Sequence, residues 1–176
     1  VLEDAGHEVK VIDCCAYEYG LEAALRIIAE FKPEMVVIDT STPSIYNDVK
    51  TGAEIKKILP DCFVVLMGTH PSALPDETLK SGSAIDAVAV GEADYTLREL
   101  AQKLSQADLH AVQSDDGYRN NLLSPIEGIA YRTRSGVYVN KRREFIANLD
   151  ELPFVSRVYK KHLDTKKYFF AASDYP

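Results

Sequence analysis

The sequence predicts an α/β domain in which a parallel sheet is covered by helices on both faces. Short apolar runs alternate along the chain with segments whose leucine and isoleucine residues recur at helical spacing. The runs 35–38 (MVVI) and 63–67 (FVVLM) have the continuous apolar composition of strands that are buried on both faces of a sheet. Alternating strands and helices favour parallel pairing, because a parallel connection needs a crossover segment, which is usually a helix.

The expected elements follow one another from residue 2 to residue 104. Residues 2–5 have the pattern of a last helical turn, which ends at Gly6. Strands are expected at 8–12, 35–38, 62–67 and 84–90. Helices are expected at 21–31, 48–59, 76–80 and 95–104, the second of them capped by Asn47.

After residue 104 the alternation ends. The polar segment 105–123 is expected to be a loop, and 126–132 and 137–141 are expected to form a β-hairpin around a glycine-containing turn. An extended tail is expected from Asp150 to the aromatic cluster 168–170. The predicted organisation is an α/β domain over 1–110, a linker with the hairpin over 111–150 and the extended tail over 151–176.

Composition and charge limit the classes of function. The 176 residues are 46% hydrophobic and carry a formal net charge of −7. Nucleic acid is a poor match as the main partner, because phosphate binding needs a basic surface, and no apolar run is long enough to span a membrane. Cys14, Cys15 and Cys62 show no CxxC spacing, so we expect reduced, structural thiols and a cytoplasmic protein. The basic run 141–143 is expected to lie on a solvated arm of the hairpin.

Three loops at successive strand ends carry the candidate chemistry, namely Thr40–Ser44, Gly68–Ser72 and Gly91–Asp94. Because the carboxyl ends of parallel strands meet at one edge of a sheet, we expect these loops to lie where open α/β sheets bind ligands. Their small and hydroxyl-bearing residues let a large ligand approach and offer hydrogen bonds without presenting a nucleophile. Taken singly, each loop also fits a plain turn with a helix cap.

Single residues leave alternatives open. His70 fits a metal ligand, an acid or base, or a structural loop residue. Asp39 and Thr69 fit a phospho-receiver, but that class needs a lysine at the end of the following strand. This chain has Val90-Gly91 there. The sequence contains neither GxGxxG nor GxxxxGKS/T, so dinucleotide and P-loop sites have no support.

The motifs of these loops resemble the N-terminal part of cobalamin-dependent radical SAM enzymes. The matching segments are 40–44 (TSTPS), 68–79 (GTHPSALPDETL), 91–94 (GEAD) followed by Thr96-Leu97, and 149–153 (LDELP). Within that class the chain is similar to the anaerobic Mg-protoporphyrin IX monomethyl ester cyclases. Residues 40–50 and 152–159 resemble more closely the hopanoid-biosynthesis radical SAM proteins.

The resemblance implies a B12-binding domain of flavodoxin-like (Rossmann-like) strand order 2-1-3-4-5, followed by the linker hairpin. In the full-length enzyme a radical SAM barrel would follow, with a CxxxCxxC motif for a 4Fe–4S cluster and with S-adenosylmethionine. This chain stops at Pro176 before such a motif, so we expect no catalysis by this chain alone. The resemblance implies cobalamin as its cofactor and the barrel as its partner. By the same analogy, the nucleotide tail of cobalamin would enter the carboxyl edge of the sheet between Ser41, Thr42, Gly68, Thr69, His70, Gly91 and Glu92.

Two departures from the family pattern shape the remaining expectations. The DxHxxG loop that supplies an axial histidine in B12 mutases and methionine synthases is replaced by Asp13-Cys14-Cys15-Ala16. Because the chain opens on a helix end and has no initiator Met, we expect the first strand to precede it and to lie between 8–12 and 35–38. That gap would be filled by an altered strand order, by strand exchange in a homodimer, or only poorly. The alternative function is a docking domain of the same fold that binds no cofactor.

Overall fold

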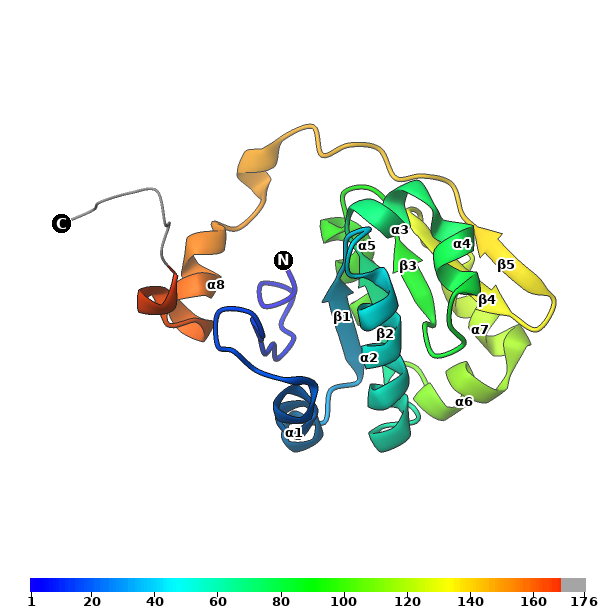
Figure 1. The fold of residues 1–176 in the computed structure, drawn as a ribbon. Coiled ribbons are helices and arrows are strands. Elements are labelled where there is room, and N and C mark those ends of the chain that lie inside the picture. Colours follow the sequence, from blue (N-terminus) through cyan, green and yellow to red (C-terminus); the bar gives the residue numbers. More distant parts are fainter. Residues whose placement is uncertain (169–176) are drawn as a thin grey trace.

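The structure, a computed structural model, describes residues 1–168, and its framework is one five-stranded sheet of order β1-β2-β3-β4-β5 (Figure 1). The strands are β1 (Met35–Asp39), β2 (Phe63–Met67), β3 (Ala87–Ala89), β4 (Ile129–Thr133) and β5 (Gly136–Val139). The first three pair in parallel, whereas β3 with β4 and β4 with β5 pair antiparallel. The predicted α/β fold with a parallel sheet and a C-terminal hairpin is confirmed, and the hairpin extends the same sheet.

Helices cover both faces of this sheet. They are α1 (Leu21–Phe31), α2 (Ile45–Ile58), α3 (Thr69–Ala73), α4 (Pro75–Lys80), α5 (Asp94–Leu104), α6 (Leu109–Ser114), α7 (Asp116–Leu123) and α8 (Val155–His162), with 3-10 turns at Leu149–Glu151 and Thr165–Lys167. Alternate residues of a strand point to opposite faces. Phe63 and Val65 accordingly pack in a core with α5, α6 and α7, whereas Val64 and Leu66 pack in a core with α1, α2 and α4. Figure 1 shows α2 and α4 in front of the sheet.

The strand expected at 8–12 is wrong. These residues form no strand, and β1 is an edge of the sheet within residues 1–168. Ile12 nevertheless packs against one of the two cores. An alternating pattern buries one side of an irregular segment as readily as one face of a strand, so the pattern alone does not require pairing. Because β1 lies at the edge of the sheet, it is only half buried from Met35 to Ile38, whereas β2 is fully buried over its first four residues.

The loop expected at 105–123 is also wrong, because α6 and α7 occupy this segment. Asp108 and Asp115 cap the two helices by accepting hydrogen bonds from backbone N–H groups of the first turn. Val112 and Leu123 are fully buried in the core beneath α5. So few buried apolar residues in a polar segment give too weak a periodicity to predict either helix.

Smaller differences concern the segments that follow the strands. α2 begins at Ile45, so Ser44 is its N-cap and Asn47 lies inside its first turn. The loop expected after β2 contains α3, and the strand expected at 84–90 is limited to Ala87–Ala89. α3 starts at Thr69, directly after Gly68 at the end of β2, and this brings its residues to the candidate site.

The extended tail expected beyond residue 150 instead contains α8. This helix lies beside the N-terminal segment, where His162 Nε2 is 2.7 Å from Glu3 Oε1 (Figure 1). The Tyr168 hydroxyl donates to Asp13 Oδ2 at 2.8 Å. The other two members of the predicted aromatic cluster, residues 169 and 170, lie outside the described residues. None of the helices in the described part of the chain combines the length and the apolar composition of a membrane span.

Candidate functional site

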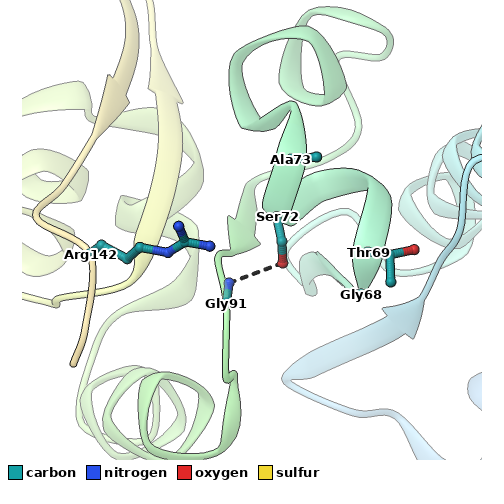
Figure 2. Close-up of a pocket in the computed structure, with 6 residues that line it drawn as sticks. All are labelled: Gly68, Thr69, Ser72, Ala73, Gly91 and Arg142. Carbon is teal, nitrogen blue, oxygen red and sulfur yellow. Dashed lines mark hydrogen bonds between the residues drawn. The ribbon is translucent and has the colours of Figure 1, made fainter. Parts of the chain in front are cut away.

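An open cleft of about 490 Å³ lies at the carboxyl edge of the parallel strands, between α3 and the segment that follows β3. Figure 2 shows that its lining comes from three separate parts of the chain. The lining residues are Gly68, Thr69, Ser72, Ala73, Gly91 and Arg142. The cleft therefore joins two of the predicted strand-end loops to a residue that follows the hairpin.

Gly68 brings the end of β2 against the end of β1. Its φ of +113° and ψ of −166° describe a conformation that is essentially restricted to glycine. A Cβ at this position would lie 2.2 Å from the Thr40 carbonyl oxygen and 2.7 Å from Asp39 Oδ1. The Thr40 N–H donates to the Met67 carbonyl at 2.8 Å, which holds the two strand ends together. The first wall of the cleft thus depends on the absence of a side chain at residue 68.

Gly91 forms the facing wall. It has a φ of +80°, and its N–H donates to Ser72 Oγ at 3.0 Å, a bond that ties the end of β3 to α3 (Figure 2). A Cβ on Gly91 would lie 3.5 Å from Arg142 Nε, and within residues 1–168 the other atom that it would meet within 4 Å is Nη2 of the same guanidinium. A larger side chain at residue 91 would therefore extend into the space in front of Arg142.

Arg142 reaches the cleft because its neighbours are anchored on either side. Lys141 Nζ pairs with Glu127 Oε1 at 2.8 Å. Arg143 forms an ion pair with Glu99 of α5 and is only partly exposed. The prediction that the whole basic run lies on a solvated arm is therefore wrong for Arg143, which fastens this segment to α5. Arg142 itself is exposed, and its guanidinium faces Gly91.

The loop after β1 uses its polar groups internally. The buried Thr40 hydroxyl donates to Asp48, and His70 Nδ1 lies 3.2 Å from Thr42 Oγ1. His70 is only 9% exposed, so this contact holds the loop after β1 against α3. Ser41 is exposed. In the described part of the chain, no group of three His, Cys, Asp or Glu side chains is placed to hold a metal ion.

The residues predicted from the sequence fall into two sets. Those that line the cleft are Gly68, Thr69 and Gly91. Those outside its lining are Ser41, Thr42, His70 and Glu92. Glu92 Oε2 accepts a hydrogen bond from the Ile146 N–H at 2.8 Å, so it fastens the segment that follows Arg142.

Three lining residues were not among the single residues predicted from the sequence, although Ser72 belongs to the predicted loop Gly68–Ser72. Ser72 and Ala73 lie in the motif that follows β2. Their position directly after a strand is the sequence signal that could have indicated them as cleft residues. Nothing in the basic run 141–143 distinguishes Arg142 from its neighbours. Its role depends on how the hairpin joins the sheet.

The chemistry of the cleft suits binding. Among the described residues that line it, the functional groups are two hydroxyls, backbone amides and one guanidinium, and none is a carboxylate, thiol or imidazole. The Cys62 thiol does not belong to the cleft, because Cys62 precedes β2 whereas Gly68, which lines the cleft, follows it. Burial raises the pKa of this thiol to about 12. Such a surface holds a large polar ligand through hydrogen bonds and charge, without a nucleophile to react with it.

Comparison with known proteins gives the site a context. Residues 1–101 match the profile of the family described as the B12 binding domain. An uncharacterized methyltransferase of Pyrococcus horikoshii is 31% identical over 150 residues, which are 85% of this chain and 30% of that protein. The anaerobic magnesium-protoporphyrin IX monomethyl ester cyclase of Rubrivivax gelatinosus is 26% identical over 132 residues, which are 75% of this chain and 22% of that protein. The chain thus spans less than a third of the length of these relatives.

A solved structure shares the fold. The radical S-adenosylmethionine methyltransferase TsrM of Kitasatospora setae, solved with cobalamin and a 4Fe–4S cluster, matches with a TM-score of 0.57 at 20% identity. The match covers 84% of this chain and 25% of that one. The shared fold therefore corresponds to one portion of that larger protein.

Proposed function

Because this chain belongs to the B12-binding domain family, we propose that it binds cobalamin at the carboxyl edge of its sheet, as the cobalamin-binding module of a radical SAM enzyme. The observation that carries the proposal is the cleft, in which Gly68 and Gly91 open facing walls and Arg142 supplies a positive charge. When bound, cobalamin would supply methyl-transfer or other radical-linked chemistry at its cobalt. The residues of this chain would bind and orient it.

The lining of the cleft fits the chemical groups of cobalamin. The corrin ring carries amide side chains, with which the hydroxyls of Thr69 and Ser72 can exchange hydrogen bonds. The nucleotide tail contains a phosphodiester, whose oxygens match the planar donors of the Arg142 guanidinium. The two glycines leave room for a bulky ligand to approach the backbone.

The remaining sequence-predicted residues would support the cleft from outside its lining. Thr42 and His70 would hold the loop after β1 against α3, and Ser41 would lie at the rim. Glu92 would keep the segment with Arg142 near Gly91, through its bond to the Ile146 N–H.

The proposed partner is a radical SAM domain in the same protein, because this chain corresponds to only 30% of the archaeal methyltransferase and 25% of the structural relative. S-adenosylmethionine and a 4Fe–4S cluster would belong to that domain, and either methyl transfer or oxidative cyclisation would be the reaction of the whole. A homodimer through the outer edge of β1 is a further proposal, supported by the half-buried state of that strand. Light scattering after size exclusion that gives only the monomer mass would contradict the dimer.

Titration with hydroxocobalamin, followed by its visible spectrum, tests the cofactor proposal. We expect a saturable spectral change with this chain. Gly91→Leu should weaken binding at least about tenfold, which corresponds to about 1.4 kcal/mol, because the new side chain would fill the space in front of Arg142. Gly6→Leu is the matched control, since Gly6 also has a positive φ (+89°) but no atom of the described residues lies within 4 Å of an added Cβ. Equal weakening by the two variants would contradict the proposed place of binding.

The alternative, a docking domain without a cofactor, has one observation in its favour. The polar groups of the loop after β1 already bond to one another, as Thr40 with Asp48 and Thr42 with His70 show. This alternative predicts no spectral change with hydroxocobalamin from a protein whose circular dichroism shows an intact α/β fold.

A further inference from the structure

A second pocket, of about 560 Å³, lies at the opposite edge of the sheet from the cleft. It is bounded by the second half of α2, the segment before β3, the helices α6 and α7, and the end of β4. Figure 1 shows α6 and α7 toward the lower side of the sheet. Its charged lining residues are Lys56, Asp86, Asp116, Arg119, Arg132 and Arg134. The proposed cobalamin site uses none of them.

Asp86 is the buried centre of this pocket, and two cations share its carboxylate. Asp86 Oδ2 accepts a hydrogen bond from the Val64 N–H at 2.7 Å and lies 2.7 Å from Lys56 Nζ. Asp86 Oδ1 lies 3.2 Å from Arg119 Nη2. The side chains of Lys56 and Arg119 are only 16% and 12% exposed. One carboxylate balances one of these two charges, so a positive charge remains in a largely buried place.

Arg132 brings a third cation to the same pocket. Its Nη2 donates to the carbonyls of Leu79 and Gly82, and it makes no ion pair with any residue of 1–168. Burial lowers the pKa of Arg132, and the neighbouring charge of Arg119 lowers it further. Cations in this pocket therefore repel one another in the absence of a further anion.

Gln113 adds an unused donor. Its Oε1 accepts a hydrogen bond from Arg119 Nη2 at 2.8 Å, which fixes the orientation of the amide. The buried Nε2 of the same amide has no hydrogen-bond partner within the described residues. A buried donor without an acceptor is unfavourable, and an acceptor oxygen in the pocket would remove that cost.

We propose that this pocket binds a small molecule through a phosphate group. Its four cations and two carboxylates leave an excess of two positive charges, which a phosphate dianion would neutralise. Guanidinium groups match phosphate oxygens in geometry, and Lys56 adds a compact charge. Ala53, Pro60 and Ala84 give apolar surface for the rest of the ligand. The excess is local, because the chain as a whole is acidic at −7.

Isothermal titration calorimetry with inorganic phosphate, at an ionic strength kept constant with sodium chloride, tests this proposal. We expect saturable binding at a single site, and Lys56→Met should weaken it at least about tenfold, because a charged donor is lost. Lys57→Met is the matched control, since Lys57 lies on the same helix and pairs with Glu54 on the exposed surface. Its phosphate affinity should stay within about twofold of the wild type.

A second variant keeps the test decisive if Lys56→Met disturbs the fold. Ala53→Glu leaves the contacts of Asp86 in place and puts a negative charge into the pocket, so it should abolish phosphate binding. No saturable binding by the wild-type chain, or equal phosphate affinity of Lys56→Met and Lys57→Met, would overturn the proposal. So would an unchanged affinity of Ala53→Glu. Hydroxocobalamin titrations of the same variants should match the wild type, which separates this site from the cleft.

Discussion

Replacing Gly68 by alanine tests the geometry on which the cleft depends. The φ of +113° and ψ of −166° at this residue lie in a region that costs a residue with a side chain about 1–3 kcal/mol. The added Cβ would also lie 2.2 Å from the Thr40 carbonyl oxygen, a backbone atom that moves only if the end of β1 moves. Overpacking of this kind costs about 1–3 kcal/mol. Together the two effects predict a loss of about 4 kcal/mol in the free energy of unfolding.

Urea denaturation followed by circular dichroism measures this loss. With an m-value of about 2 kcal/mol per molar urea, the midpoint should fall by about 2 M. Gly6→Ala is the control, because Gly6 has a φ of +89° and, in the part of the chain that the structure describes, nothing lies within 4 Å of an added Cβ. It should lose only the backbone strain of about 1–2 kcal/mol. If the midpoint of Gly68→Ala fell no further than that of Gly6→Ala, the close approach of the two strand ends would be refuted.

The other predictions concern the cleft, the buried thiol and a helix cap. Arg142→Gln should weaken hydroxocobalamin binding at least about tenfold in a spectral titration. Lys141→Gln should not, because the Lys141 charge is paired with Glu127. Equal effects of the two variants would contradict a role of Arg142 in binding. Because burial raises the pKa of Cys62 to about 12, its contribution to stability is present at neutral pH and is lost as the pH rises above 9 toward that value. Cys62→Ala should therefore flatten the fall of stability in this pH window, as measured by urea denaturation, and an unchanged fall would contradict the assignment. Asp115→Ala should lower the free energy of unfolding by about 1 kcal/mol, because α7 loses the two hydrogen bonds to its first turn; an unchanged thermal midpoint would show that the cap contributes nothing.

The part of the site that the sequence predicts follows from parallel topology. Residues 35–38 and 62–67 predict strands, because continuous apolar runs are typical of a parallel sheet covered on both faces. β2 is fully buried over its first four residues as predicted, whereas the edge strand β1 is only half buried. Once those strands are parallel, their carboxyl ends share one edge. The loops that begin with Gly68 and Gly91 must then lie near each other, and both line the cleft.

The part that the sequence does not predict depends on pairing between distant residues. Arg142 reaches the cleft because β4 pairs antiparallel with β3, with Ala87 opposite Tyr131. The local pattern of the hairpin predicts two strands and a turn, but it does not indicate which strand of the sheet they join. The second pocket could not be predicted for the same reason, since Lys56, Arg119 and Arg132 come from separate elements that meet only in the folded chain.

The short helices and the N-terminal segment show a different limit. The capping residues Asp108 and Asp115 are the signal that could have predicted α6 and α7, because their buried apolar residues are too few to set a period. At 8–12 the alternation of apolar and polar residues is clear, but Ile12 packs beside the core without any strand pairing of this segment.

The central claim is that cobalamin binds with its nucleotide tail in the cleft between Gly68 and Gly91. The most direct measurement compares titrations with hydroxocobalamin and with cobinamide, which has the corrin ring but lacks the nucleotide tail and its phosphodiester. We predict saturable binding of hydroxocobalamin and an affinity for cobinamide that is at least about tenfold lower. Equal affinity for the two corrinoids, or no binding of hydroxocobalamin, would contradict this account.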